Sequence, residues 1–310
     1  MKEPRVYGLV LDRIDVLVDL PVELVPGIFL QRATSQQVTC MLPTIGDYDR
    51  NLPRAFSHET GPEGGELRPI EAERWRFYLV DAPASRFAED GPTIENTLFE
   101  LSKASRLATV ELPCEYLVFG VTRDGELKEA MRRTSLLGRP ECFLVAKKPL
   151  PFDGECLRQL RAVWAQLRKL DRQHWLRQSL DMYFELRPMM RTGLYALSVF
   201  ALIEGILTHS PAFREEMVKR QITNKLNLLN KRFEIPIDYA CFPNSDPGTV
   251  WANLQNLRNT IAHGGRPDFH GELADLGGHE VAVDFLDQVV KKLLRHALKE
   301  PELITDLREC

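Results

Sequence analysis

Short apolar runs separated by turn residues fill the first 150 residues and predict a β-rich region. Val6–Asp19 (VYGLVLDRIDVLVD) alternates apolar and polar positions in places, as a strand or hairpin does. Further strands are expected at Gly27–Leu30, Gln37–Leu42, Trp75–Asp81, Thr109–Leu112, Tyr116–Thr122 and Glu141–Ala146. One helix is expected after Thr93, which can cap it, with Ile94, Leu98 and Leu101 on one face. The glycines and prolines of Asp47–Pro69 predict a long loop.

From Glu155 onward the apolar residues recur at three and four positions, which predicts helices. After a helix at about 155–170, the expected helices are Trp175–Leu186, Met189–Thr208, a helix from Pro211 to about Phe233, Pro247–His263 and Val281–Leu298. Met189–Thr208 is apolar nearly all round, so it should lie buried at the centre of a bundle. The turn-rich segment Lys147–Gly154 separates the two parts. The fold class is therefore an α+β, β-rich domain over residues 1–150 followed by an all-α domain over residues 151–310.

Composition favours a globular protein without a membrane span. Of the 310 residues, 44% are hydrophobic and 27% charged, which argues against disorder. The longest apolar stretch, Gly193–Leu207, is interrupted by Ser198 and Glu204 and is too short for a bilayer. Met1–Leu20 carries too many charges for a signal peptide. The six cysteines form no CxxC pair, so a cytoplasmic location with reduced thiols is expected.

Charge is distributed unevenly along the chain. Residues 155–232 hold 14 basic and 7 acidic side chains, whereas the flanking parts are acidic. A basic segment favours a polyanionic partner, although basic residues on helical surfaces also serve solubility alone.

The segment Leu257–Gly265 (LRNTIAHGG) holds the candidate chemistry. If the helix from Pro247 continues to about residue 262, Asn259 and His263 share a face. Gly264 and Gly265 are helix terminators, which places His263 at the exposed carboxyl end of the helix. A protonated histidine is stabilised there by the helix dipole.

An arginine and a histidine are sufficient to cleave RNA without a metal. His263 can act as general base or general acid, and Arg258 can bind the phosphate through two hydrogen bonds. Asn259 can orient the imidazole or bind the phosphate. One histidine cannot readily perform both proton transfers, but a two-fold dimer would supply a second. The alternative is structural, because a histidine at a helix end is commonly a cap or a surface group.

The RNxxxH pattern of Arg258, Asn259 and His263 near the end of a helical bundle resembles the HEPN superfamily. The helix Ala196–Ser210 and the basic segment Ile222–Phe233 are also similar to bacterial HEPN proteins of the phage-defence type. The resemblance covers roughly Glu155–Leu298 and leaves residues 1–150 unexplained. It implies a homodimeric helical bundle with a metal-independent endoribonuclease site at the dimer interface, often in antiviral defence or stress response. In this comparison Arg258 activates the phosphate, His263 transfers protons and Asn259 supports them.

Other polar residues complete the candidate site. Glu204 lies in an apolar helix, where it could orient the Arg–His pair or form a structural ion pair with Arg191 or Arg258. A candidate RNA-backbone stripe, or otherwise a solvated face, is formed by Lys219, Arg220, Lys225, Lys231 and Arg232. His270 and His279 match no metal-ligand spacing, so no metal is expected.

Two other functions remain open at this point. Some HEPN proteins only bind and assemble, so the chain could be a non-catalytic dimerisation module with a β-rich recognition domain. A nucleotide-binding or nucleotidyl-transferring unit lacks support, since neither GxGxxG nor GxxxxGK[ST] occurs and no cofactor is implied. In the nuclease reading residues 1–150 would sense a trigger, bind a regulatory partner or select the substrate, and in the binding module they would recognise a partner.

Overall fold

The chain divides into two compact units, Met1–Arg168 and Lys169–Cys310. In this computed structural model the described residues are 5–10, 14–48, 57–60, 67–69, 71, 76–83, 94–108, 116–121, 127–133, 150–171, 174–186, 191–208 and 215–309. The strands among them all lie in the first unit, and the elements of the second unit are helical. The expected change from a sheet-containing part to a helical part is therefore confirmed.

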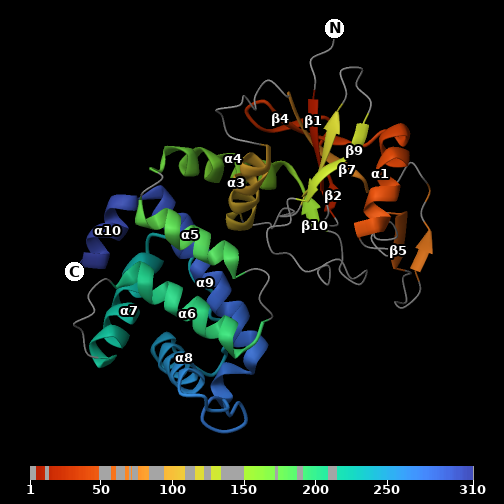
Figure 1. The fold of residues 1–310 in the computed structure, drawn as a ribbon. Coiled ribbons are helices and arrows are strands. Elements are labelled where there is room, and N and C mark those ends of the chain that lie inside the picture. The colour runs from red at the N-terminus through yellow and green to blue at the C-terminus, as the bar shows by residue number, and fades with distance from the viewer. Residues whose placement is uncertain are drawn as a thin grey trace. The chain divides into compact units, whose positions relative to one another are not determined.

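A six-stranded sheet forms the centre of the first unit (Figure 1). Neighbouring strands all pair antiparallel. Their spatial order is β3 (Val22–Val25), β4 (Ile28–Arg32), β7 (Tyr78–Pro83), β1 (Arg5–Val10), β8 (Tyr116–Val121) and β9 (Leu127–Arg133). β7 is buried from Tyr78 to Ala82, as a central strand covered on both faces should be.

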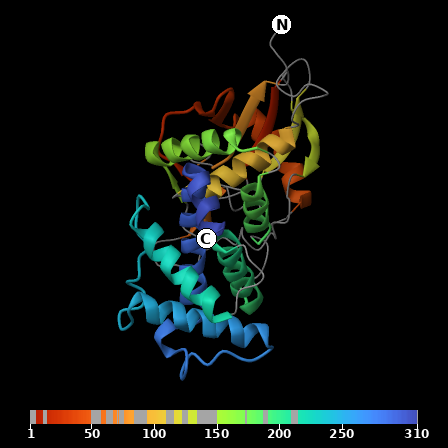
Figure 2. The same cartoon turned by 90° about the vertical axis from the view of Figure 1, so that its left-hand side faces the viewer.

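Helices cover both faces of this sheet. α1 (Ser35–Tyr48) lies on one face, while α3 (Ile94–Leu107) and α4 (Gly154–Lys169) lie on the other (Figures 1 and 2). Two small ladders complete the unit: β10 (Leu150–Phe152) pairs parallel with β2 (Ile14–Val16), and β5 (His58–Thr60) pairs antiparallel with β6 (Leu67–Pro69).

The strand expected at Gln37–Leu42 is wrong, because these residues belong to α1. Thr34 and Gln37 form a capping box: the Thr34 amide donates to Gln37 Oε1 at 2.8 Å, and the Gln37 amide donates to Thr34 Oγ1 at 3.2 Å. Val38 and Met41, three residues apart, are buried at 5% and 0% exposure. The T-x-x-Q signal in the sequence therefore outweighs the β-propensity of the residues that follow.

The expected long loop Asp47–Pro69 is wrong in part, because it contains β5 and β6. The expected helix after Thr93 is confirmed as α3, although Thr93 itself lies outside the described residues. The strands expected at Thr109–Leu112 and Glu141–Ala146 also lie outside them.

α4 belongs to the sheet-containing unit. Its apolar stripe, which includes Cys156, Leu160 and Leu167, is buried. The Arg161 guanidinium donates to the main-chain carbonyls of Leu24, at 3.2 Å, and of Glu23. The boundary in the structure therefore follows Arg168, whereas the turn-rich segment at residue 150 places it before α4.

The second unit is built around α6 (Gly193–Leu207), which contacts α5 (Trp175–Glu185), α7 (Glu215–Asn230), α8 (Pro247–Ala262), α9 (His279–Lys299) and α10 (Pro301–Glu309). The short 3-10 helix η4 (Ala274–Leu276) follows α8. α7 ends at Asn230 rather than Phe233, and Pro211 lies outside the described residues. None of the described helices is long and apolar enough to span a membrane.

α6 is not buried all round, which corrects the expectation from its composition. Val199, Ile203 and Ile206 are fully buried, but Leu194 is 58% exposed. Ala201 and Gly205, seven and eleven residues further on, are exposed as well. These spacings put the three on one face together with Ser198, so α6 presents Leu194 and a row of small residues at the surface, which we call the α6 stripe.

Candidate functional site

The beginning of α8 is fixed by a strong N-terminal cap. The Asp246 carboxylate accepts hydrogen bonds from the amides of Gly248, at 2.8 Å, and Thr249, at 3.2 Å. Hydrogen bonds from Thr249 and Gly248 hold the Asp246 pKa below its usual value. Pro247 occupies the first helical turn, where its missing amide costs nothing.

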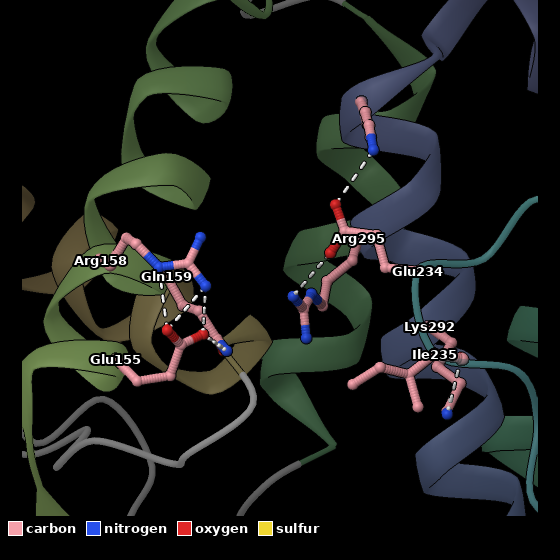
Figure 3. Close-up of polar contacts among 8 residues, drawn as sticks. Glu155, Arg158, Gln159, Glu234, Ile235, Lys292 and Arg295 are labelled. Carbon is pink, nitrogen blue, oxygen red and sulfur yellow. Dashed lines mark hydrogen bonds and ion pairs between the residues drawn. The ribbon is translucent and has the colours of Figure 1, made fainter.

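The loop that precedes α8 is fastened to α9 (Figure 3). Glu234 Oε1 lies 3.0 Å from Lys299 Nζ, and Glu234 Oε2 lies 3.7 Å from Arg295 Nη2. Lys292 donates to the carbonyls of Ile235, at 3.0 Å, and Pro236, at 2.6 Å. Desolvation lowers the pKa of Lys292. These contacts attach the segment that leads to the N-terminus of α8 to α9. The RNxxxH motif lies at the other, C-terminal end of α8.

The packing of α8 then sets which way its last turns face. Trp251 is 2% exposed and packs against two rings. Its ring centroid lies 6.3 Å from that of Phe200 on α6 and 5.8 Å from that of Phe285 on α9. Near the other end, an ideal Cβ on Gly193 would lie 3.4 Å from Ile261. The N-terminus of α6 therefore adjoins the C-terminus of α8, where the motif lies.

α8 ends as expected, in a turn that leaves His263 at the surface. Gly264 has φ +74°, and its amide donates to the Ile261 carbonyl at 3.0 Å. The Gly265 amide donates to the Thr260 carbonyl at 2.8 Å, which completes a Schellman motif. His263 is the exposed C-cap. Its imidazole makes no hydrogen bond or ion pair with the residues that the structure describes.

The Arg258 guanidinium lies between two acceptors. Its Nη2 is 3.5 Å from Glu204 Oε2 on α6, and its Nη1 donates to Asn259 Oδ1 at 3.0 Å. The two charged side chains are 30% and 18% exposed, so the ion pair is shielded without being sealed from solvent. Of the two arginines considered for Glu204, Arg258 is the one it contacts, while Arg191 pairs with Glu280, at 3.8 Å, and with Asp284.

Sequence reasoning missed one residue of this group, Gln255. Its side chain is buried, and its Nε2 donates to Asn259 Oδ1 at 3.4 Å. The sequence signal was a side-chain amide four residues before Asn259, within the apolar face of Leu254 and Leu257. The structure thus joins Glu204, Arg258, Asn259 and Gln255 in one polar chain, with His263 at the end of the same helix.

The expected RNA-backbone stripe is corrected at Lys225. This side chain is 8% exposed, and its ammonium donates to the Leu207 carbonyl at 2.9 Å. Lys225 therefore satisfies the C-terminal end of α6, where the helix dipole favours a cation, and does not face solvent.

The other members of the stripe do not form a single helical face either. Lys231 and Arg232 lie beyond the end of α7, and Arg232 pairs with Glu300 at 3.2 Å. Lys219 and Arg220 are on α7, but their side chains lie outside the described residues. Exposed Lys231 remains a candidate for contact with a polyanion.

After the motif, the imidazole of His279 and the main-chain amide of His270 have other partners. His279 Nε2 lies 2.9 Å from the Arg191 carbonyl, and Asp268 accepts hydrogen bonds from the amides of His270, at 3.0 Å, and Gly271, at 2.9 Å. Within the described parts of the chain, no three metal-ligating side chains come together.

Comparison with known proteins identifies no similar protein. Neither a family model, nor a curated protein, nor a solved structure matches this chain. Any function must therefore be argued from the residues and geometry described above.

Proposed function

We propose that this protein is a metal-independent endoribonuclease that acts as a homodimer, in prokaryotic defence or stress response. The observation that supports it best is the geometry at the end of α8. A half-buried Arg258 is held by Glu204 and Asn259, and the same helix ends one turn later at the exposed imidazole of His263.

The chemistry follows from these groups. His263 accepts the proton of a ribose 2′-hydroxyl, and the 2′-oxygen attacks the neighbouring phosphorus. The bond from phosphorus to the 5′-oxygen breaks, and that oxygen takes up a proton. The products are a 2′,3′-cyclic phosphate and a 5′-hydroxyl. Arg258 stabilises the charge that develops on the phosphoryl oxygens.

A second copy would supply the second imidazole. One His263 serves as base and the other as acid if a two-fold axis brings the two motifs together. The α6 stripe is the surface best suited to that contact, because it exposes Leu194 among small residues and lies on the helix that contributes Glu204 to the site. Gly193, next to the exposed Leu194, adjoins Ile261 near the end of α8.

RNA cleavage in excess EDTA tests the proposal. We expect the wild-type protein to cleave a mixture of structured and single-stranded RNA and to leave 2′,3′-cyclic phosphate ends. His263→Ala should lower the rate by about 10²–10⁴-fold, the usual contribution of general acid–base catalysis. Arg258→Ala should lower it by about 10²–10³-fold, as the loss of one charge-stabilising group does.

His270→Ala is the matched control, because it removes another exposed imidazole seven residues further on and should leave the rate unchanged. Cleavage that survives His263→Ala, or disappears in EDTA, would contradict the proposal. Absence of cleavage by a dimeric wild-type protein would favour the alternative, a HEPN-type binding module.

A further inference from the structure

Gln255 belongs to the polar chain at the end of α8, although the RNxxxH motif does not include it. Its side chain is only 5% exposed. A buried amide is costly unless it is hydrogen-bonded, so its partner should reveal why it is there. That partner is Asn259 Oδ1, which lies 3.4 Å from Gln255 Nε2 on the same helix face, four residues away.

Asn259 Oδ1 is shared between two donors. It accepts from Gln255 and also from Arg258 Nη1 at 3.0 Å. If the carboxamide of Asn259 were flipped, its NH₂ group would face both donors and each would lose its acceptor. Together the two donors fix the orientation of this carboxamide and direct its Nδ2 away from them.

This orientation also determines how Arg258 is held. The guanidinium has one acceptor from α6, Glu204 Oε2 at 3.5 Å, and one from α8, Asn259 Oδ1. The first is a charged contact between separate helices. The second depends on the carboxamide, and therefore on the buried side chain behind it.

We propose that Gln255 is a positioning residue for the Arg258–Asn259 pair. It keeps Asn259 Oδ1 on the guanidinium and leaves the Asn259 Nδ2 hydrogens for a phosphoryl oxygen of the RNA. Gln255 does not touch the substrate and acts through Asn259. Its catalytic consequence rests on the proposed nuclease function, whereas its geometric consequence does not.

The sharpest test is Gln255→Glu, which keeps the size of the side chain but replaces its donor by an oxygen that repels Asn259 Oδ1. We expect kcat in EDTA to fall by about 10–100-fold, as a misplaced catalytic group does, with a much smaller change in KM. Gln255→Met, which removes the donor without adding charge, should give a smaller fall of the same kind. Asn256→Asp is the control: the same chemical change at an exposed position of α8 should leave kcat unchanged.

A second readout does not depend on cleavage. In ¹⁵N NMR spectra, Gln255→Glu should shift the Asn259 side-chain NH₂ signals and the Arg258 Nε–H signal, and Asn256→Asp should not. Thermal melting followed by circular dichroism measures how much of each variant is folded.

The results of these experiments distinguish a failure of the role of Gln255 from a failure of the proposed function. Unchanged Asn259 and Arg258 signals, an unchanged kcat, or a fall in kcat no larger than the loss of folded protein would each overturn the role of Gln255. Shifted signals in a protein whose wild type cleaves no RNA would support the geometric part and overturn both the catalytic part and the proposed function.

Discussion

At the scale of single residues, His296 on α9 is a buried base. Its side chain is 4% exposed, and its Nε2 has no hydrogen-bond partner among the described residues. The nearest carboxylate oxygen is Glu300 Oε1, at 3.8 Å, and the Phe233 ring lies edge-on at 5.4 Å. Burial lowers the pKa of His296 more than the surrounding charges of Glu300, Arg232, Lys299 and Glu234 change it.

This burial predicts a loss of stability in acid. The unfolded chain takes up a proton at His296 near pH 6.5, while the folded chain takes it up only at lower pH. Well above pH 6.5 His296 is neutral in both states, so it does not make the free energy of unfolding depend on pH. As the pH falls from about 6.5 to the pKa of His296 in the folded chain, the free energy of unfolding decreases by up to about 1.4 kcal/mol per pH unit. Below that folded-state pKa the decrease stops.

Urea unfolding of wild type and His296→Leu at several pH values between 7.5 and 5 measures this effect. The variant should show the weaker pH dependence, and His270→Leu, at an exposed position, should match the wild type. Equal slopes for His296→Leu and wild type would show that His296 is not the buried base responsible.

At the scale of elements, the end of α8 needs its two glycines for different reasons. Gly264 has φ +74°, but a Cβ there would meet nothing within 4 Å, so an alanine is opposed only by the backbone conformation. A Cβ on Gly265 would lie 3.0 Å from Thr260 Cγ2 and 3.1 Å from the Thr260 carbonyl oxygen, so Gly265 permits a close approach.

Gly264→Ala should therefore destabilise the protein by about 1–2 kcal/mol, the cost of a left-handed conformation with a side chain. Gly154→Ala is the matched control with the opposite sign. Gly154 is the exposed first residue of α4 and has open space around it, so alanine should stabilise the protein by about 0.4–1 kcal/mol. Urea unfolding free energies of both variants measure the contrast; destabilisation by both would contradict it.

A helix can be predicted from sequence where apolar residues recur at helical spacing over many positions, or where capping and stop residues mark its two ends. α8 has clear signals at both ends, the Asp246 cap before Pro247 and the Gly264–Gly265 stop, so the predicted range Pro247–His263 agrees with the observed Pro247–Ala262. α1 departs from the expected strand because Val38 and Thr39 favour strands locally, whereas the capping box of Thr34 and Gln37 starts a helix.

The candidate site could be predicted only as far as it lies on one helix. Arg258, Asn259 and His263 follow from local spacing. The choice of Arg258 over Arg191 as the partner of Glu204 depends on how α6 packs on α8. Lys225 shows the same limit, because a lysine in a basic helix appears solvent-facing until its carbonyl partner on another helix is known.

At the scale of the whole molecule, the α6 stripe is where oligomerisation should be tested. Leu194 is 58% exposed, and in a monomer this apolar side chain would lie in water on the same face of α6 as Ala201 and Gly205. If two copies pack through the stripe, Leu194 is buried twice in a two-fold interface. Leu194→Glu then introduces two like charges in place of two apolar contacts, which a dimer cannot bury without a large cost.

Sedimentation velocity over a range of protein concentrations should find the wild type as a dimer and Leu194→Glu as a monomer. RNA cleavage should be lost with dimerisation, because each active site would lack its second His263. Leu228→Glu, at a 49% exposed position on α7, is the control and should remain dimeric and active. A monomer of Leu194→Glu that cleaves RNA at the wild-type rate would mean that one Arg258–His263 pair is sufficient, and that the second proton transfer comes from water or from another group on the same chain.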